Sequence, residues 1–301
     1  MAHTGVTIHE GKDAPTLAQR TTLRLGGRVL GEVCLSEPSA AGFLPEIATR
    51  LGGKLVCLGA GSNILAGEGP LSLVVVRNTM PPAISLVEED LAGCVVRATA
   101  SVRLPKLIRY AAAAGLSGLE GLSGIPGTVG GAVAMNAGSY GQCIGDTLVA
   151  LEIVTGLGDQ KRFFRDALAF EYRAMTHPEA HSWWMVTAAE FRLTRKSPEM
   201  VHARGRECIN QKRATQPVTA ASAGCVFKNP SPDNPAGKLL DAAGFKGKRL
   251  GGMAFSSMHA NFLVNEGGGT SSEALALLDE AMRRVVVTSG IMLEPEVKLW
   301  V

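Results

Sequence analysis

The segment Ser222–Pro230 places a thiol, a cation and an amide close together. Cys225 follows Gly224 directly, and Lys228 and Asn229 come shortly after it. A cysteine in an electropositive and partly exposed setting can donate a proton, or attack as a thiolate. Most cysteines are instead small, inert and buried. Taken alone, Cys225 would be interpreted as such a buried cysteine. The glycine on one side and Lys-Asn-Pro on the other predict a loop, which weakens that alternative and leaves Cys225 a candidate proton donor or nucleophile.

Two carboxylates lie near the C-terminus, in Leu293-Glu-Pro-Glu-Val297. The sequence predicts a last strand from about Met292 to Val301, in which alternation puts Glu294 and Glu296 on one face. Like charges on one face disfavour ionisation of each other, which suits general acid catalysis. The alternative is a solvent-facing edge strand, with which Pro295 is compatible.

Arg173 is a candidate anion-binding residue. It follows Tyr172 in the sequence Phe170-Glu-Tyr-Arg173. A guanidinium group can make a bidentate contact with a carboxylate or a phosphate, although an arginine taken alone is more often a solvated surface residue. Further polar groups, His259-Ala-Asn261, precede an apolar run that begins at Phe262, and a lone histidine there is more often structural than catalytic.

Two glycine-containing segments could hold a phosphate-bearing cofactor. Gly59-Ala-Gly-Ser-Asn63 follows the apolar run Lys54–Leu58, and adjacent N–H groups in such a turn form a concave nest for phosphate oxygens. A dinucleotide fingerprint would need glycine where Ile64 stands, so a plain Rossmann interpretation fails. The segment Gly121–Gly141 is richer in small residues, and its backbone N–H groups must be satisfied somewhere. We favour a ligand-binding loop there; the alternatives are an ordinary turn for the first segment and a close-packed structural loop for the second.

Strand and helix patterns alternate along the chain. Predicted strands cover residues 54–58, 72–76, 93–100, 148–154 and 184–193, and predicted helices cover 38–51 and 106–114. A basic helix opens at Ser197-Pro198 and must end before Gln216-Pro217. Thr270-Ser-Ser-Glu273 is a capping box for a helix with one apolar face, which Gly290 closes.

Composition indicates a folded, globular protein. The 301 residues are 46% apolar and 19% charged, with 30 basic and 27 acidic side chains. This argues against disorder, and no basic block indicates nucleic acid binding. The longest uncharged run, residues 121–145, is interrupted by glycines and Pro126, so we expect no membrane segment. The six cysteines include no CxxC pair, which argues against a metal site and a disulfide framework. The N-terminus has no secretory signal pattern, and we expect a cytoplasmic protein.

With these segments in place, the chain resembles the UDP-N-acetylenolpyruvoylglucosamine reductase family, also called UDP-N-acetylmuramate dehydrogenases. The resemblance runs from about Leu23 to Glu296. Its most specific motifs stand in family order: Gly-Ile-Pro-Gly-Thr-Val-Gly-Gly131 with Met135-Asn-Ala-Gly138, Gly224-Cys-Val-Phe-Lys-Asn-Pro230, His259-Ala-Asn261 and Leu293-Glu-Pro-Glu-Val297.

The resemblance implies an α+β protein with two domains. The first would be a two-lobed FAD-binding domain of the vanillyl-alcohol-oxidase (PCMH) type, and the second a smaller α+β substrate-binding domain. We expect the FAD-binding domain at residues 1–197, with its lobes divided near 80–90, and the substrate-binding domain at 198–290. Residues 291–301 would form a C-terminal strand that returns Glu296 to the active site.

The resemblance also implies a reaction. The family reduces the enolpyruvyl ether of UDP-N-acetylglucosamine enolpyruvate to the lactyl ether of UDP-N-acetylmuramate, in peptidoglycan precursor synthesis. FAD would be bound non-covalently, and NADPH would be the co-substrate. The expected partner is the nucleotide-sugar substrate, with no nucleic acid, no membrane and no obligate protein partner.

Site residues follow from the matching motifs. By resemblance, Arg173 and Glu296 stabilise the negative charge that builds on the substrate carboxylate, and Cys225 protonates the neighbouring carbon. The implied FAD-binding residues are Gly59, Ala60, Gly61, Ser62, Asn63, Gly121, Ser123, Gly124, Ile125, Pro126, Gly127, Thr128, Gly130, Gly131, Asn136, Ala137 and Gly138. The implied substrate-binding residues are Tyr172, Arg213, Lys228, Asn229, His259 and Asn261. No metal ligand is implied.

The main departure from the family is Cys225, which stands where serine is usual. A thiol is more acidic than a hydroxyl and can still donate a proton, whereas a thiolate favoured by Lys228 could not. Met175 and the segment Gly67-Glu-Gly69 also differ from the family pattern. The chain lacks the tyrosine-bearing loop of one branch, so we predict the shorter branch.

Two rival functions differ in class. An oxidase on the same scaffold would not need Cys225, and many such oxidases attach the flavin to a histidine. The histidines before the domain boundary lie outside the glycine-rich segments: His3, His9, His177 and His181. A non-catalytic protein that senses nucleotide sugars predicts loss of Arg173, Cys225 or Glu296, and all three positions hold usable side chains.

Overall fold

The computed structural model describes residues 4–91, 93–178 and 180–301. The chain forms two units, each made of separate stretches. The N-terminal unit consists of the described residues up to Asp13, Leu30–Ala60 and Ser72–Gln211. The C-terminal unit consists of Ala14–Val29, Gly61–Leu71 and Lys212–Val301. The division of the chain into units therefore does not follow sequence order, and each unit is described by itself.

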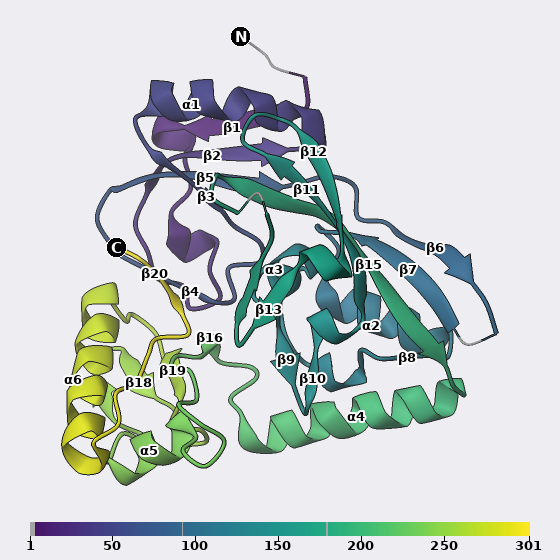
Figure 1. The fold of residues 1–301 in the computed structure, drawn as a ribbon. Coiled ribbons are helices and arrows are strands. Elements are labelled where there is room, and N and C mark those ends of the chain that lie inside the picture. The colour runs from purple at the N-terminus through teal and green to yellow at the C-terminus, as the bar shows by residue number, and fades with distance from the viewer. Residues whose placement is uncertain (1–3, 92, 179) are drawn as a thin grey trace. The chain divides into compact units, whose positions relative to one another are not determined.

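A four-stranded sheet forms the first part of the N-terminal unit, in the order β1-β2-β5-β3. Its strands are β1 (Val6–Glu10), β2 (Val29–Leu35), β3 (Lys54–Cys57) and β5 (Leu71–Asn78). β1 and β2 are antiparallel, whereas β3 and β5 are parallel. Helix α1 (Leu44–Leu51) lies along this sheet (Figure 1) and buries Leu44 and Ile47 in a core with Val33 and Val74. It ends at Gly52, which has the left-handed conformation (φ 73°) that glycine adopts without strain.

A second sheet carries most of the remaining strands of this unit, in the order β12-β11-β15-β7-β6, with β8 also paired to β15. The strands are β6 (Ile84–Glu89), β7 (Gly93–Thr99), β8 (Leu116–Ser117), β11 (Leu148–Thr155), β12 (Gln160–Phe164) and β15 (Trp184–Arg195). Helices α2 (Leu104–Ala113) and α3 (Val129–Ala134) share a core with it, in which Leu107 and Val133 join Val96 and Phe191. Pro105 lies in the first turn of α2, where its missing N–H costs no hydrogen bond.

Two small hairpins and a long helix complete the N-terminal unit. The hairpins are β9 (Gly138–Ser139) with β10 (Gln142–Cys143), and β13 (Ala169–Glu171) with β14 (Ala174–Thr176). Helix α4 (Pro198–Thr215) spans the division between the units at Gln211. Short 3-10 helices cover Gly11–Asp13, Leu17–Gln19, Pro38–Phe43, Glu120–Leu122, Ile144–Asp146 and Arg165–Ala167.

The C-terminal unit is built on an antiparallel sheet in the order β16-β19-β18-β17. Its strands are β16 (Ala221–Cys225), β17 (Arg249–Leu250), β18 (Met253–Phe255) and β19 (Phe262–Asn265). Helices α5 (Ala236–Ala242) and α6 (Ser271–Ser289) pack with the sheet (Figure 1) around Phe227, Phe245 and Leu277. A parallel pair, β4 (Ile64–Ala66) with β20 (Lys298–Trp300), belongs to the same unit.

The structure confirms most of the predicted elements and corrects four. The predicted capping box is present, since Thr270 Oγ1 accepts from Glu273 N at 3.2 Å and Glu273 Oε2 accepts from Thr270 N at 3.0 Å. The predicted helix 38–51 begins as a 3-10 helix and becomes α-helical only at Leu44. The predicted strand 292–301 is wrong except for Lys298–Trp300, and the two predicted loops around Cys225 and Gly121–Gly141 contain regular structure. Among the described residues, no helix has the length and apolar character needed to cross a membrane.

Candidate functional site

Arg173 lies at the tip of the β13–β14 hairpin in the N-terminal unit. Glu171 pairs with Ala174, which leaves Tyr172 and Arg173 as a two-residue loop. Arg173 has a φ of 60°, in the left-handed region that costs a non-glycine residue free energy. Its guanidinium group lies 4.9 Å from the centroid of the Tyr172 ring. The tight loop therefore sets the direction in which the Arg173 side chain leaves the backbone, and its guanidinium group contacts the Tyr172 ring.

Asn136 connects this hairpin with the end of α3. Its Nδ2 donates to the carbonyl oxygen of Glu171 at 3.0 Å, and its Oδ1 accepts from Gly145 N at 3.3 Å. The side chain is 8% exposed. The sequence predicted a cofactor-binding residue at this position; in the structure both ends of its amide bond the backbone of the N-terminal unit.

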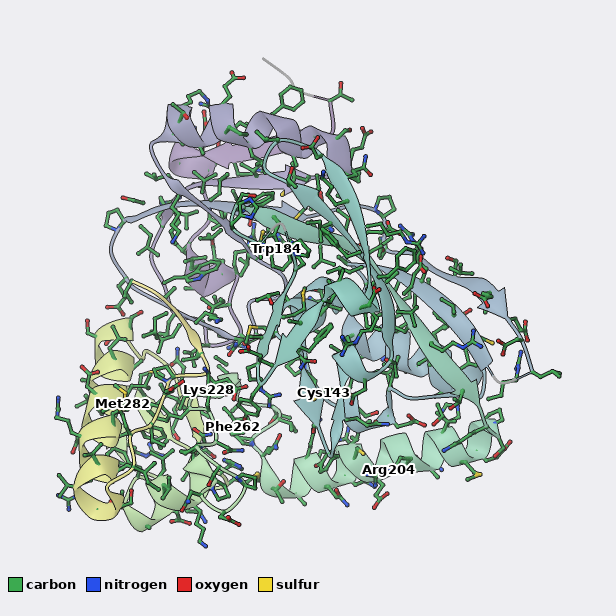
Figure 2. All side chains as sticks on the ribbon, viewed as in Figure 1. Cys143, Trp184, Arg204, Lys228, Phe262 and Met282 are labelled. Atoms are coloured by element: carbon green, nitrogen blue, oxygen red, sulfur yellow. The ribbon has the colours of Figure 1, made fainter. Side chains whose placement is uncertain are left out.

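Cys143 is a thiol near Arg173 that sequence reasoning did not single out. It pairs with Gly138 in the β9–β10 hairpin, where Figure 2 labels it. A Cβ added to Gly138 would lie 2.6 Å from Cys143 Sγ and 3.4 Å from Arg173 Nη1, so only glycine leaves room for both groups. Burial raises the pKa of the Cys143 thiol, Asp146 adds to this effect and Arg173 opposes it. Cys143 and Arg173 are thirty positions apart in the sequence, which leaves no sequence signal for this proximity.

The two predicted cofactor segments meet at Gly59. A Cβ added to Gly59 would lie 2.9 Å from Thr128 Oγ1, closer than such atoms normally approach. Thr128 caps α3, because its Oγ1 accepts from Gly131 N at 3.3 Å. Gly59 therefore lets its segment approach the Thr128 side chain closely, which brings the two predicted cofactor segments together.

Other glycines of the second segment pack against protein. A Cβ on Gly121 would lie 2.5 Å from Gln142 Oε1, and one on Gly130 would lie 2.8 Å from the Cβ of Ala100. Their N–H groups donate to Gln142 Oε1 and to the carbonyl oxygen of Ala100. Close packing, the alternative left open by the sequence, therefore accounts for these two glycines. The remaining predicted cofactor residues of the segment lie between Gly121 and the first residue of β9: Ser123, Gly124, Ile125, Pro126, Gly127, Gly131, Ala137 and Gly138.

Cys225 is the last residue of β16 in the C-terminal unit and not part of a loop. It pairs with Phe262 on β19, after a register irregularity that begins at Ser222. Gly224 occupies this bulge with a φ of 80°, and a bulge re-aims the side chain that follows it. The predicted loop was wrong because the glycine marks a bulge within a strand rather than the end of one. The thiol is partly exposed.

Glu296 lies beside the residue that follows Cys225. Its backbone N–H donates to the carbonyl oxygen of Val226 at 2.8 Å, and Lys228 N donates to the carbonyl oxygen of Glu294 at 2.9 Å. A single isolated bridge pairs Phe227 with Pro295. Proline has no N–H to donate, so the pairing does not extend into the strand that the sequence predicted.

The two carboxylates have different surroundings. Glu294 is exposed and its Oε2 accepts from Lys228 Nζ at 3.1 Å, an ion pair in which both side chains remain accessible (Lys228 is labelled in Figure 2). Glu296 is partly buried. Only Glu296 is therefore held at the backbone next to the thiol, whereas Glu294 neutralises a neighbouring lysine.

The motif His259-Ala-Asn261 is hydrogen-bonded to the residues that follow Cys225. Asn261 is 2% exposed, and its Nδ2 donates to Phe227 O at 2.8 Å while its Oδ1 accepts from Phe227 N at 3.0 Å. Its own carbonyl accepts from Val226 N at 2.9 Å. His259 Nδ1 accepts from Asn261 N at 3.2 Å, so the proton of the neutral imidazole is on Nε2. The predicted substrate-binding side chain of Asn261 thus clamps the backbone two residues after Cys225.

Of four other predicted site residues in the C-terminal unit, three pack against or bond to protein and one is exposed to solvent. Asn63 Nδ2 donates to the carbonyl oxygen of Glu296 at 3.2 Å, so this predicted cofactor residue fixes the glutamate segment. Gly61, with a φ of 67°, leaves room for the carbonyl oxygen of Arg20. Asn229 Oδ1 accepts from Ala236 N at 3.0 Å, at the start of α5. Arg213 is exposed in the last turn of α4.

The structure also groups His9, Glu32 and Cys34, whose ligand atoms lie within 4.8 Å of one another. His9 pairs with Glu32 across β1 and β2, and Cys34 is two residues further along the same face. Glu32 is 1% exposed and forms an ion pair with Arg77 at 3.6 Å. The arginine already compensates the buried carboxylate, so we assign this cluster to the stability of the sheet. Sequence spacing did not reveal it, because the strand pairing brings the residues together.

Two family models match the chain. Residues 216–300 match the C-terminal domain of UDP-N-acetylenolpyruvoylglucosamine reductase, and residues 44–163 match an FAD binding domain. These matches confirm the predicted fold class, an α+β protein with a PCMH-type FAD-binding domain and a second, smaller domain.

Whole proteins match over nearly the full chain. The UDP-N-acetylenolpyruvoylglucosamine reductase of Nitratidesulfovibrio vulgaris is 49% identical over 95% of this chain and 97% of its own length. The protein of the same name from Oleidesulfovibrio alaskensis is 48% identical over 95% of this chain and 96% of its own. The crystal structure of UDP-N-acetylenolpyruvylglucosamine reductase from Thermus caldophilus matches 98% of this chain and 99% of its own, with 33% identity and a TM-score of 0.79.

Proposed function

Since the chain belongs to the UDP-N-acetylenolpyruvoylglucosamine reductase family, we propose that Arg173, Cys225 and Glu296 are the groups that carry out its reaction. The chain reduces UDP-N-acetylglucosamine enolpyruvate to UDP-N-acetylmuramate, a step of peptidoglycan precursor synthesis. It uses FAD as cofactor and NADPH as reductant, and its substrate is a nucleotide sugar. When bound, FAD passes hydride from NADPH to the enolpyruvyl double bond.

Residues of the N-terminal unit would hold the cofactor. The close approach of Gly59 to Thr128 supports this proposal, because it brings together the two segments that the sequence predicts to bind the cofactor. In the C-terminal unit, Gly61 and Asn63 remain candidates through their backbone N–H groups, since the Asn63 side chain donates to Glu296 O. A bare backbone next to a capped helix suits the oxygens of a pyrophosphate.

Two of the proposed catalytic groups would stabilise negative charge, and the third would donate a proton. Arrival of hydride at the vinyl carbon builds negative charge on the substrate carboxylate. The guanidinium group of Arg173 would bind that carboxylate, and Glu296, in its protonated form, would donate a hydrogen bond to it, so that stabilisation is greatest in the transition state. Cys225 would hold a proton at Sγ and deliver it to the carbon next to the carboxylate.

The observation that carries the proposal is the backbone bond between Glu296 and Val226 at 2.8 Å. It places the glutamate immediately beside the chain that bears Cys225, which a merely solvent-facing edge strand would not require. The partly exposed thiol at the bulge and the rigid turn at Arg173 also support it. The sensing protein predicts loss of at least one of these three side chains, and all three are present.

Substrate binding is proposed for the exposed polar residues. Tyr172, Arg213 and Lys228 are accessible and can contact the nucleotide sugar. Asn229, His259 and Asn261 would support the site through the backbone contacts described above. The shorter branch of the family remains a prediction.

The test is the half-reaction in which substrate oxidises enzyme reduced by NADPH. We expect Cys225→Ala to slow this half-reaction by about 10²–10⁴-fold and to leave reduction by NADPH unchanged, because only the proton donor is lost. Cys225→Ser should restore most of the rate. Cys34→Ser, a partly exposed thiol on β2, is the matched control and should behave like the wild type. A Cys225→Ala enzyme oxidised at the wild-type rate would show that the proton comes from another group.

A further inference from the structure

We propose that Asn136 is a positioning residue that holds the Arg173 hairpin, rather than a ligand of the cofactor. The inference rests on the proposed role of Arg173 and names a residue that this role requires. Asn136 lies just after α3, and Arg173 lies 37 residues later on a different hairpin. The link between them is made by the Asn136 side chain.

Both ends of the Asn136 amide are used. Nδ2 donates to Glu171 O at 3.0 Å, and Oδ1 accepts from Gly145 N at 3.3 Å. The side chain is 8% exposed, so each bond replaces one to water in a poorly solvated place. Glu171 is the last paired residue before the Tyr172–Arg173 loop. The amide therefore fixes the base of the loop to the 3-10 turn at Gly145.

The residue type at this position must satisfy two requirements. Asn136 has a φ of 40°, and asparagine tolerates this left-handed conformation better than most residues. Glycine would satisfy the backbone requirement without the amide. Aspartate would keep the backbone tolerance and the acceptor for Gly145, but it could not donate to Glu171. These two substitutions therefore separate the backbone function from the tethering function.

The hairpin needs such a tether because Arg173 itself has an unfavourable conformation. A non-glycine residue at φ 60° is strained, and it persists only when its surroundings fix it. The guanidinium group also approaches the backbone at Gly138, where an added Cβ would lie 3.4 Å from Nη1. Gly138 comes two residues after Asn136. Asn136 thus holds the base of the Arg173 loop, and Gly138, two residues later, lies next to the guanidinium group.

The test compares Asn136→Asp and Asn136→Gly with the wild type in three measurements: the Kd for FAD, the rate of reduction by NADPH, and the rate at which substrate oxidises the reduced enzyme. We expect FAD affinity within about twofold of wild type, unchanged reduction, and oxidation by substrate slowed by about 10–10²-fold, because a displaced cation no longer meets the developing charge. The loss should appear in kcat and not solely in KM.

The matched control is Asn78→Asp. Asn78 makes the same type of bridge elsewhere in the N-terminal unit, with Nδ2 donating to Val186 O at 3.2 Å and Oδ1 accepting from Met80 N at 3.0 Å. This variant should lose a similar amount of stability without slowing oxidation by substrate. A variant of Asn136 that slows the reaction only as much as Asn78→Asp does would reveal a general loss of structure and overturn the inference.

A double-mutant cycle with Arg173→Ala tests whether Asn136 acts through Arg173 or independently of it. If Asn136 acts through Arg173, Asn136→Asp should not slow oxidation by substrate any further once Arg173→Ala has removed the guanidinium group. Additive losses, or weakened FAD binding with a normal oxidation rate at saturation, would overturn the inference. If Arg173→Ala alone leaves oxidation by substrate unchanged, the proposed role of Arg173 fails. If Arg173→Ala is slow and Asn136→Asp is normal, only the inference about Asn136 fails.

Discussion

The backbone N–H of Glu296 donates a 2.8 Å hydrogen bond to the carbonyl oxygen of Val226. Because Val226 follows Cys225 directly, this bond aligns the two chain segments that bear the proposed acid and the proposed carboxylate. Asn261 holds the same stretch from its other side, through both backbone groups of Phe227. The thiol segment is therefore fixed by contacts that involve no reacting atom, and these contacts can be tested separately from the chemistry.

Removing the Asn261 amide should destabilise the C-terminal unit. Asn261→Ala leaves the N–H and the carbonyl of Phe227 without partners in a buried place, at about 1–3 kcal/mol for each group. We expect the free energy of unfolding to fall by about 2–4 kcal/mol, measured by denaturant unfolding. Asn229→Ala removes one bond at the start of α5 and should cost about 1 kcal/mol. Equal losses in the two variants would show that Asn261 is not the clamp described here.

Gly224→Ala should impair the thiol more than it impairs the fold. Gly224 has a φ of 80° and nothing lies within 4 Å of an added Cβ, so the cost is the backbone conformation alone, about 1–2 kcal/mol. Gly244→Ala is the matched control, with a φ of 82° and the same open surroundings. Both variants should lose similar stability in denaturant unfolding, but only Gly224→Ala should slow oxidation of the reduced enzyme by substrate. Similar oxidation rates in both variants would show that the bulge at Gly224 does not affect the reaction.

His259 should make stability depend on pH below neutrality. Burial lowers the pKa of its imidazole from the ordinary value of 6.5, a backbone hydrogen bond opposes the shift, and the charge of Lys246 adds to it. As pH falls through the unfolded pKa near 6.5, the unfolded chain takes up a proton that the folded protein refuses until its own lower pKa is reached. Stability should therefore decrease across this window and recover as pH rises.

Denaturant unfolding of wild type and His259→Asn at pH 5.5 and 7.5 measures this effect. Asparagine keeps an acceptor near the position of Nδ1, where Asn261 N donates, but it does not titrate. The wild type should lose more stability at the lower pH than the variant does. Equal losses would mean that His259 titrates in the folded protein as it does in the unfolded chain.

Local signals in the sequence predicted the elements that depend on local physics. The capping box at Thr270 and the closing Gly290 predicted the ends of α6, because caps act within one turn. Gly52 and Gly115 marked helix ends for the same reason. Strands such as β11 and β15 followed from their apolar runs.

The errors arose where pairing between distant segments decides the structure. Pro295 interrupts the predicted last strand, because it cannot donate to its partner Phe227. Gly224 indicated a loop from sequence alone, and the partner strand β19 turns it into a bulge. The bonds of Asn136 to Glu171 and of Asn63 to Glu296 join residues far apart in sequence, so a motif could name these asparagines without indicating what they bind.

The central claim is that the chain transfers hydride from NADPH to an enolpyruvyl nucleotide sugar. The most direct measurement reduces the purified holoenzyme anaerobically with NADPH and follows the flavin absorbance at about 450 nm. UDP-N-acetylglucosamine enolpyruvate is then added, with air admitted to a parallel sample as the comparison. NADPH should bleach the flavin, and the absorbance should recover rapidly when the nucleotide sugar is added without oxygen. Recovery with oxygen alone would contradict the account and favour an oxidase.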